Sequence, residues 1–470
     1  MIIKRIHFCG VGGVAMASLA VMCSNLGYDV SGSDLVIYSP MKEYLLKHKI
    51  RIFSGYKKDT IKQINADVYI IGNALSRGNI EVETILNEGY FYLSLPEFLK
   101  IEFLRQRKNI VITGTHGKTS VTSLSAFLLD SGGLNPGFMV GGVPAHFDVS
   151  ARAGDVGGWF VIEGDEYDTS LFDKRSKFFH YLPRVVVINN LEFDHGDIFT
   201  DLADIKKSFK LMLRQLPANG VVFVNGDDED ALSVTKDLPS KVISFGLGDK
   251  CDVRVTNFTY DIKSAKSRFN INTLEGEVIP ISTSLWGEFN ARNITAGALV
   301  ANYCSLSWEV IKDGISNFKN VARRLDLLNK SDDFKVYDDF SHHPTAILET
   351  SKAIKKSHLN SRLKVIYEPR SNTSIGKIHQ ASMAKSFFHC DKIIIYPSAS
   401  WRKLAPDKRL DIDKVVQEIG DRACVINDLQ NLKNQLIKGS RAGDILIFMS
   451  QGDFGGLPKE LGNYFDNHYL

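Results

Sequence analysis

The sequence predicts an α/β protein of three domains, with a Rossmann-like domain at each end and a P-loop ATPase-type α/β domain between them. Its length of 470 residues exceeds what one ordinary hydrophobic core accommodates. Short apolar strands alternate with helical patterns in three successive runs, which is typical of parallel α/β structure. The first two runs each place a glycine-rich turn between a strand and a helix. We therefore expect domains at 1–105, 106–321 and 322–470.

The first run begins with a strand at 4–10, which leads through a glycine turn into a helix at 14–27. A second strand is expected at 28–34, and a further strand at 66–74 reaches a loop at Asn73. This order is that of a nucleotide-binding α/β unit.

The second run opens with the strand 110–114 and the helix 118–133, and the third run starts near 321–328. Alternating polar and apolar residues from 251 to 286 indicate antiparallel strands, and a helix is expected at 290–306. The other segments with strand or strand–helix patterns are 158–166, 183–192, 219–228, 334–356, 363–369, 390–397 and 443–450.

The composition excludes several classes of protein. Hydrophobic residues make up 44% and charged residues 24%, and the net charge of +3 is too small to indicate a nucleic-acid partner. The six cysteines are scattered without a Cys-x-x-Cys pair, which fits a reducing cytosol. No apolar run reaches the roughly 20 residues of a membrane helix, and the first strand starts too early to leave room for a signal peptide. We expect a cytoplasmic protein without membrane insertion.

The first glycine turn has the Gly-x-Gly-x-x-Ala spacing of a dinucleotide-binding loop. Gly10, Gly12 and Gly13 follow a strand, Ala15 lies in the helix, and Asp34 ends the next strand. Such a turn lets backbone N–H groups approach a pyrophosphate at the helix N-terminus. Alone, the pattern leaves open a nicotinamide site, another diphosphonucleotide site or a merely structural tight turn.

The second glycine turn, "VITGTHGKTS", resembles a phosphate-binding loop that is two residues shorter than usual. Lys118 would neutralise the β- and γ-phosphates, the Thr119 hydroxyl would bind Mg²⁺, and the amides from Gly114 onward would surround the phosphates. A chance Gly-Lys-Thr is the alternative, although a second phosphate loop in the same chain argues against it. The pattern assigns His116 no chemical role of its own.

Acidic residues follow two later strands of the second run. Glu163 and Glu166 come at the end of one strand, where α/β ligands bind and where a carboxylate could hold Mg²⁺. For Asp165 and Asp168 we favour a solvated acidic loop. Asp194 and His195 follow the next strand. An isolated Asp-His pair is weak evidence for a functional site, but its position at the carboxyl end of a strand strengthens it.

The third run carries its own polar cluster. Asp338, Asp339, His342 and His343 end a strand and begin a helix, where they could bind a ribose or a base or simply cap the helix. Arg370 follows another apolar strand and suits a two-point grip on a carboxylate, with a surface salt bridge as the equal alternative.

In order and spacing, these segments resemble the Mur ligases, the ATP-dependent amide-forming enzymes of peptidoglycan metabolism. The resemblance covers essentially the whole chain, and the short Gly-Thr-His-Gly-Lys-Thr loop is its most specific part. The segments in family order are "FCGVGG", "GSD", "IIGNALSRGN", "TGTHGKTS", "IEGDEYD", "NNLEFDH", "ARRLD", "DDFSHHPTAI" and "MSQGDFGG".

Within the family, four stretches are most similar to members that act in peptidoglycan recycling. Those members join the tripeptide L-alanyl-γ-D-glutamyl-meso-diaminopimelate to UDP-N-acetylmuramate. The stretches are "PGFMVGGVP" (136–144), "FDKRSKFFHY" (172–181), "NNLEFDH" (189–195) and "EPRSNTS" (368–374). The alternative within the family is a ligase that adds L-alanine to the same sugar nucleotide.

The resemblance implies a UDP-N-acetylmuramate-binding first domain, a central ATP-binding domain and a C-terminal peptide-binding domain. It implies ATP and Mg²⁺ as cofactors, and we expect a monomer or a weak homodimer. The implied UDP-sugar residues are Gly10, Gly12, Gly13, Ser33, Asp34 and Asn73. The implied ATP-binding residues are Gly114, Thr115, His116, Gly117, Lys118, Thr119, Ser120, Asn290, Arg324 and Asp339. Lys118, Glu163 and His195 are the implied catalytic residues, Thr119, Glu163 and His195 the metal ligands, and Arg370 the peptide-binding residue.

Three departures from the family pattern limit this transfer. Phe289 replaces the histidine of the family's Gly-x-His-Asn-x-x-Asn segment, although Asn290 and Asn293 are present. Ser208 stands where several relatives have a carbamylated lysine, so we assign no such residue. Gln451 and Asp453 stand in the last motif where asparagine and glycine are expected.

The mechanism implied by the resemblance is stepwise. ATP phosphorylates the lactyl carboxylate of the sugar nucleotide, the alanine amine attacks the acyl phosphate, and phosphate leaves as the amide forms. Two rivals from other classes are a nicotinamide-dependent oxidoreductase, which the phosphate loop at 114–119 disfavours, and a non-catalytic nucleotide sensor, which Lys118, Glu163 and His195 together disfavour.

Overall fold

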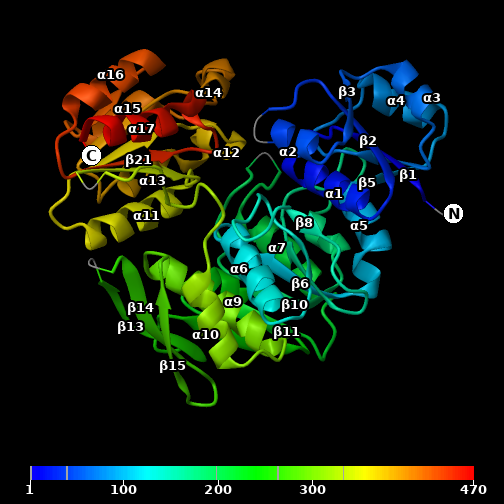
Figure 1. The fold of residues 1–470 in the computed structure, drawn as a ribbon, viewed down its shortest axis with the longest axis horizontal. Coiled ribbons are helices and arrows are strands. Elements are labelled where there is room, and N and C mark those ends of the chain that lie inside the picture. Colours follow the sequence, from blue (N-terminus) through cyan, green and yellow to red (C-terminus); the bar gives the residue numbers. More distant parts are fainter. Residues whose placement is uncertain (1–2, 39–40, 197, 262–263, 332, 470) are drawn as a thin grey trace.

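The computed structural model describes residues 3–38, 41–196, 198–261, 264–331 and 333–469. It contains three separate β-sheets with helices around them, so the α/β fold class expected from the sequence is confirmed. In Figure 1 the N-terminal domain lies at the upper right, the C-terminal domain at the upper left and the central domain below them. The exact domain boundaries stay predictions.

The N-terminal sheet is entirely parallel, with the strand order β3-β2-β1-β4-β5. The order reverses between β1 and β4, and ligands of open α/β sheets bind at such a point, outside the carboxyl ends of the strands. The strands are β1 (Arg5–Cys9), β2 (Asp29–Asp34), β3 (Arg51–Ser54), β4 (Val68–Ile71) and β5 (Tyr92–Ser94). The helices are α1 (Val14–Asn25), α2 (Met41–Lys47), α3 (Lys58–Ile64), α4 (Ile80–Asn87), α5 (Leu95–Glu102) and the 3₁₀ turn η1 (Leu104–Gln106).

The central sheet has ten strands in the order β15-β14-β13-β12-β11-β10-β6-β9-β7-β8. Its strands are β6 (Lys108–Thr113), β7 (Gly137–Met139), β8 (Ala151–Arg152), β9 (Trp159–Glu163), β10 (Pro183–Ile188), β11 (Val221–Asn225), β12 (Lys241–Gly246), β13 (Val253–Asp261), β14 (Lys266–Asn272) and β15 (Val278–Thr283). Its helices are α6 (Lys118–Ser131), α7 (Leu202–Leu213), α8 (Glu229–Ser233), α9 (Glu288–Tyr303), α10 (Trp308–Asn317) and the 3₁₀ turn η2 (Lys177–His180).

Two features of the central sheet follow from the sequence pattern. Buried β-branched strands β6, β9, β10 and β11 are parallel neighbours, and β13 to β15 are antiparallel, as the alternation from 251 to 286 predicts. The register pairs Thr113 with Ile188 and Ile112 with Glu163. The loops that follow β6, β9 and β10 therefore emerge together at one edge.

The C-terminal sheet has the order β16-β17-β21-β18-β19-β20, and only its short β16 is antiparallel to its neighbour. Its strands are β16 (Asp326–Leu327), β17 (Phe334–Asp339), β18 (Leu363–Tyr367), β19 (Lys392–Ile395), β20 (Ala423–Val425) and β21 (Asp444–Met449). Its helices are α11 (Pro344–Ser357), α12 (Asn372–Ile375), α13 (Gln380–Ser386), α14 (Ala399–Lys403), α15 (Ile412–Ile419), α16 (Leu429–Gly439) and α17 (Leu457–Tyr469), with the 3₁₀ turns η3 (Lys377–His379) and η4 (Phe454–Gly456).

Side-chain contacts join the N-terminal domain to the central one. Ser150, just before β8, has its hydroxyl 2.7 Å from Ser18 Oγ and 3.1 Å from the Tyr44 hydroxyl, in a buried position. The ring of Phe172 lies 5.2 Å from that of Tyr92. Among the described helices, none is both long and apolar enough to cross a membrane.

Candidate active site

The short phosphate loop lies between β6 and α6 in a conformation that only glycine adopts easily. Gly114 has φ of 127° and Gly117 has φ of 83°, which strains any other residue. A Cβ on Gly117 would lie 2.4 Å from Asn189 Nδ2 and 2.6 Å from Asn293 Oδ1. Helix α6 then starts at Lys118 without a side-chain cap. Because the first N–H groups of a helix have no intrahelical acceptor, this end suits an anion.

Lys118 is held in place by two acceptors. Its Nζ donates to the Gly114 carbonyl at 2.6 Å and to Glu166 Oε2 at 2.9 Å. Burial lowers the pKa of Lys118, but the charges of Glu166 and Asp165 raise this pKa more, so that it ends above its ordinary value. The loop therefore carries a permanent positive charge beside the helix N-terminus.

Thr119 and Glu163 form an oxygen-rich site next to the loop. The Thr119 hydroxyl donates to Glu163 Oε2 at 3.1 Å, and the Gly141 amide donates to Glu163 Oε1 at 2.6 Å. Burial and the charge of Asp165 raise the pKa of Glu163 above its usual range. A cation bound here would stabilise the ionised form of Glu163. Hard oxygen donors such as these are the ligands that Mg²⁺ prefers.

Glu166 joins Lys118 to His195. The His195 Nε2 lies 3.3 Å from Glu166 Oε1 and 4.0 Å from Asp194 Oδ2. Burial raises the pKa of Glu166, but Lys118 and His195 lower it more, to about 2. Burial in turn lowers the pKa of His195, while Glu166 and Asp194 raise it to a net value above the ordinary one. Two of the three predicted catalytic residues, Lys118 and His195, thus meet at the carboxylate of Glu166.

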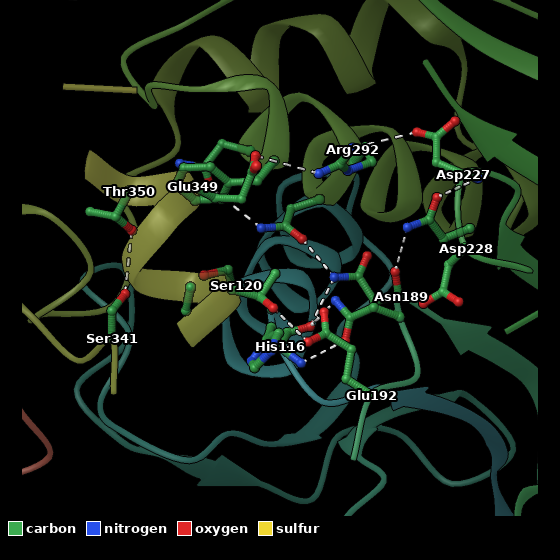
Figure 2. Close-up of a pocket in the computed structure, with 18 of the residues that line it drawn as sticks. His116, Ser120, Asn189, Glu192, Asp227, Asp228, Arg292, Ser341, Glu349 and Thr350 are labelled. Carbon is green, nitrogen blue, oxygen red and sulfur yellow. Dashed lines mark hydrogen bonds and ion pairs between the residues drawn. The ribbon is translucent and has the colours of Figure 1, made fainter. Parts of the chain in front are cut away.

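Two asparagines after β10 fix the middle of the phosphate loop. The His116 amide donates to Asn190 Oδ1 at 2.7 Å, and the His116 carbonyl accepts from the amides of Asn189 and Asn190. Asn189 also donates to Asn293 Oδ1 on α9 at 2.9 Å. Figure 2 shows Asn189 beside His116. The shortened loop is therefore held by side chains from neighbouring elements.

A cavity of about 430 Å³ opens from this loop between the central and C-terminal domains. Arg292 of α9 crosses its wall, 3.5 Å from Asp227 and 3.8 Å from Glu349 of α11 (Figure 2). Its lining residues include His116, Gly117, Ser120, Asn189, Asn225, Asp228, Phe289, Asn290, Asn293, Arg324, Asp339 and Thr345. Its volume and its mix of polar and apolar walls suit a nucleotide.

The C-terminal domain contributes two of the predicted nucleotide residues to this cavity. Arg324 Nη2 lies 3.4 Å from Thr119 Oγ1, so the arginine faces the phosphate loop across the domain boundary. Both Asp339 oxygens accept backbone amides, one from Leu325 and one from Ser341. Asp339 therefore shapes the loop that carries Arg324 as well as lining the cavity.

The predicted UDP-sugar residues gather at the carboxyl ends of β1, β2 and β4. The Gly12 amide donates to Asp34 Oδ2 at 2.8 Å, and the Gly10 amide donates to the Ser33 carbonyl at 2.8 Å. A Cβ on Gly12 would lie 2.8 Å from Asp34 Oδ2, so a larger residue would displace the carboxylate that accepts the Gly12 amide. Asn73 reaches the central domain and donates to Asp168 Oδ1 at 3.1 Å.

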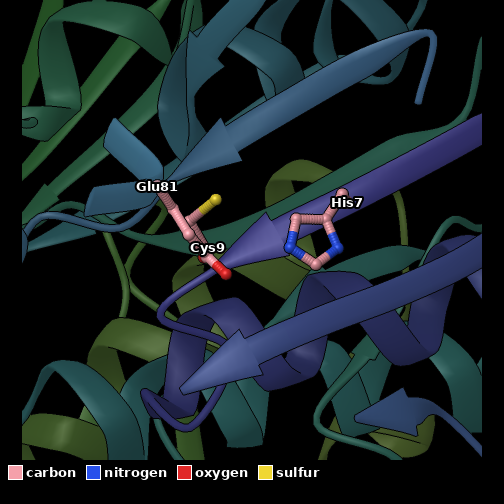
Figure 3. Close-up of side chains that lie close together, drawn as sticks. All are labelled: His7, Cys9 and Glu81. Carbon is pink, nitrogen blue, oxygen red and sulfur yellow. The ribbon is translucent and has the colours of Figure 1, made fainter. Parts of the chain in front are cut away.

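Below this turn, one face of the sheet carries a buried polar cluster. Figure 3 shows His7 and Cys9 on β1 with Glu81 of α4 beside them. The His7 ring nitrogens lie 3.0 Å from Ser31 Oγ and 3.3 Å from Ser33 Oγ, and the Ser33 hydroxyl donates to Glu81. The Ser33 side chain is thus fully buried and supports the turn from beneath.

The remaining predicted residue, Arg370, lies apart from the phosphate loop. Its side chain is half exposed and its Nη1 lies 3.8 Å from Glu368 Oε1. Two residues at the unexpected positions of the last motif have local roles: Gln451 lies 3.0 Å from His342 Nε2, and Asp453 accepts the Gly455 amide.

Sequence reasoning missed several residues that the structure brings to the site. The solvated loop expected at Asp165 and Asp168 is wrong, because their side chains are only 19% and 15% exposed. Asp168 accepts from Asn73 and Lys174, and Asp165 pairs with the buried Lys177 at 3.7 Å. Their position in the sequence could have indicated this, since both follow the carboxyl end of the buried strand β9.

Three family models match the chain in succession. The model of the Mur ligase family catalytic domain matches residues 5–107, that of the Mur ligase middle domain matches 112–301, and that of the Mur ligase glutamate ligase domain matches 323–452.

Individual relatives match over nearly the full length. The chain is 36% identical to the UDP-N-acetylmuramate–L-alanyl-γ-D-glutamyl-meso-2,6-diaminoheptandioate ligase of Escherichia coli (strain K12), over 97% of each chain. It is 30% identical to the UDP-N-acetylmuramate–L-alanine ligase of Sulfurihydrogenibium sp. (strain YO3AOP1), over 98% of each. Its structure is similar to the crystal structure of a murein peptide ligase from Psychrobacter arcticus, with a TM-score of 0.75, 30% identity and coverage of 99% of this chain and 100% of the other.

Proposed function

The chain belongs to the Mur ligase family of ATP-dependent, amide-forming ligases, and we propose that it joins the tripeptide L-alanyl-γ-D-glutamyl-meso-diaminopimelate to UDP-N-acetylmuramate. The products are the UDP-linked muramoyl tripeptide, ADP and phosphate. Such a reaction returns a murein peptide to peptidoglycan synthesis.

The observation that carries this proposal is the full-length likeness to the tripeptide ligase of Escherichia coli, 36% identical over 97% of each chain. The site supports it independently. A complete phosphate loop, a buried acidic shell and a cavity shared by two domains lie at one place. That arrangement suits phosphoryl transfer with water excluded.

ATP would lie in the cavity with its phosphates at the start of α6. The loop amides and Lys118 would hold the phosphates, and Arg324 would reach them from the C-terminal domain. Asn290 and Asn293 of α9 are positioned along the wall for the nucleoside. Phe289 lines the same wall, so the position where relatives have histidine offers an apolar ring instead.

The chemistry would proceed in two steps. The lactyl carboxylate attacks the γ-phosphorus and ADP leaves, which gives an acyl phosphate. The alanine amine then attacks the acyl carbon, and the tetrahedral intermediate collapses with loss of phosphate and of the amine proton. Lys118 stabilises the charge that develops on the transferring phosphoryl group, which a preorganised cation does effectively in a buried site.

The residues present fit Mg²⁺. Thr119 and Glu163 would bind it through oxygen atoms that lie 3.1 Å apart. His195, which contacts Glu166, would be a further ligand. Bound there, Mg²⁺ would neutralise phosphate charge. The positive charge would favour the ionised form of Glu163, whose pKa is raised. It would also lie near Glu166, the carboxylate that contacts both Lys118 and His195.

The sugar nucleotide would bind at the N-terminal turn. The backbone of Gly10, Gly12 and Gly13 would contact the pyrophosphate, and Asp34 would lie near the ribose. Asn73 would line the same site through its hydrogen bond to Asp168 of the central domain. Arg370 would receive a peptide carboxylate. The cytoplasmic location and the monomeric or weakly dimeric state expected from the sequence stay predictions.

The test is phosphate release in the presence of ATP and Mg²⁺. We expect release only when UDP-N-acetylmuramate and the tripeptide are both present. Phosphate release when one of the two substrates is left out would overturn the proposal, and so would the absence of release when both are present.

A further inference from the structure

Three histidines and one glutamate meet where the phosphate loop touches the C-terminal domain. His116 comes from the phosphate loop and Glu192 from the loop after β10, and Figure 2 shows these two side by side. His343 precedes α11, and His379 ends η3. The cluster therefore draws its members from both domains. None of them is among the predicted Mg²⁺ ligands.

The donor atoms converge on a small space. One nitrogen of His116, one of His343 and a carboxylate oxygen of Glu192 all lie within 4.8 Å of one another. Glu192 Oε2 is 3.6 Å from His343 Nδ1 and 3.8 Å from His116 Nε2. Ligands of a tetrahedral Zn²⁺ at about 2.1 Å from the metal are about 3.4 Å apart. Small side-chain rotations would therefore bring the three atoms to metal-binding distance.

The imidazoles have donor capacity that the protein does not use. Within the described part of the chain, the Nε2 atoms of His116, His343 and His379 are buried and have no hydrogen-bond partner. The His343 ring centroid lies 4.4 Å from that of His116 and 4.3 Å from that of His379. His343 and His379 are more than nine-tenths buried. Buried nitrogens without partners are costly, and a metal bound by His116 Nε2 would satisfy one of these three.

Two of the histidines and the carboxylate have shifted pKa values. Burial lowers the pKa of His343 and of His379 below the ordinary value, so both rings are neutral. Burial raises the pKa of Glu192, but its contacts with His116 and Thr345 lower it more, to about 2. Neutral imidazoles and an ionised carboxylate are the donor forms that transition metals require.

We propose that His116, Glu192 and His343 bind a divalent transition-metal ion of the Zn²⁺ type, at a site separate from the Mg²⁺ site at Thr119 and Glu163. The nitrogen-rich donor set selects such an ion over Mg²⁺, which prefers oxygen. Binding through His343 Nδ1 replaces the long 3.3 Å hydrogen bond from the Thr345 amide. His379 makes an edge contact with the His343 ring, where it can orient that ring.

The site spans the domain boundary, so a bound metal would hold His343 and α11 against the phosphate loop. Thr345 already donates to Glu192 Oε2 at 2.6 Å across this boundary. A metal that binds this contact between the domains stabilises it by mass action. Occupancy therefore couples the phosphate loop to the position of α11.

The test is titration of metal-free protein with Co²⁺ and Zn²⁺ by calorimetry, in excess Mg²⁺ and ADP so that the Mg²⁺ site is filled. We expect one ion per chain, with the absorption bands of four- or five-coordinate Co²⁺. His343→Ala and Glu192→Gln should each weaken binding by about 10- to 100-fold or more. The control His389→Ala changes a histidine outside the cluster and should leave the affinity unchanged.

Thermal unfolding supplies a second readout. Zn²⁺ should raise Tm in the parent protein and not in His343→Ala. The proposal is overturned if no ion binds in excess Mg²⁺, or if the affinity is the same in the parent and in whichever of the two cluster variants folds.

Discussion

Lys118 Nζ lies 2.9 Å from Glu166 Oε2, and the other oxygen of the same carboxylate lies 3.3 Å from His195 Nε2. Glu166 thus holds Lys118 and His195, one of the predicted metal ligands, in a fixed relation. Arriving phosphates must compete with this carboxylate for Lys118. The site is therefore preorganised and charge-balanced before it binds a nucleotide.

Replacing the phosphate-loop lysine should abolish catalysis. In Lys118→Ala, we expect the rate of ADP formation to fall by about 10²–10³-fold or more, because the cation that stabilises the transferring phosphoryl group is gone. Circular dichroism should show a folded protein. The control Lys236→Ala removes an exposed lysine and should keep full activity. Near-normal turnover of Lys118→Ala would mean that the loop has been misinterpreted.

Glu163→Gln should weaken Mg²⁺ dependence specifically. The glutamine amide oxygen can still accept from Thr119, but it lacks the negative charge that attracts the ion. We expect the Mg²⁺ concentration for half-maximal activity to rise about tenfold or more. The matched control is Glu275→Gln, at an exposed turn. An unchanged Mg²⁺ requirement would contradict the assignment of Glu163.

Arg370→Ala should raise the KM for the tripeptide by about 10- to 100-fold, since a hydrogen-bonded ion pair to a substrate carboxylate is lost. Arg370→Lys should recover only part of this loss, because lysine cannot grip both oxygens. The KM for ATP is the internal control and should stay constant. Equal KM values for the tripeptide in all three proteins would remove Arg370 from the peptide site.

A buried ion cluster predicts how acid destabilises the C-terminal domain. Asp444 is 1% exposed and contacts Arg362 at 2.6 Å and Lys364 at 2.8 Å. Burial raises the pKa of Asp444, but Arg362 and Lys364 lower it more, to a value below the ordinary one. Because the folded pKa is below the unfolded one, this stabilisation is complete at neutral pH. It is lost as pH falls below about 3.9.

Asp444→Asn should therefore lower the free energy of unfolding by about 3 kcal/mol at pH 7, because Lys364 stays buried without its partner. Urea unfolding measures the difference, which should shrink toward pH 3. The exposed Asp407→Asn is the control. A pH-independent difference would exclude the ion cluster as its cause.

Much of the fold follows from local sequence. The strands β6, β9, β10 and β11 are rich in branched apolar residues; β9 ends in Glu163, β11 ends in Asn225, and Asn189 directly follows β10. The two glycine turns are equally local signals, because a Cβ on Gly12 would displace Asp34 and Gly117 has a positive φ. The parallel register then brings Glu163 and Asn189 beside the phosphate loop.

The rest depends on contacts between distant segments. Nothing near Glu166 in the sequence indicates that it pairs with Lys118, which is 48 positions away. The sequence predicts that Asp165 and Asp168 are solvated because their partners, Lys177 and Asn73, come from other elements. The role of His116 is likewise set by Glu192 and by His343 of another domain.

The most direct test of the account compares two acceptor substrates. Enzyme, ATP, Mg²⁺ and UDP-N-acetylmuramate are mixed with either the tripeptide or L-alanine, and the ADP formed is measured. We expect turnover with the tripeptide well above that with L-alanine. Greater turnover with L-alanine would contradict it and assign the chain to the alanine-adding ligases.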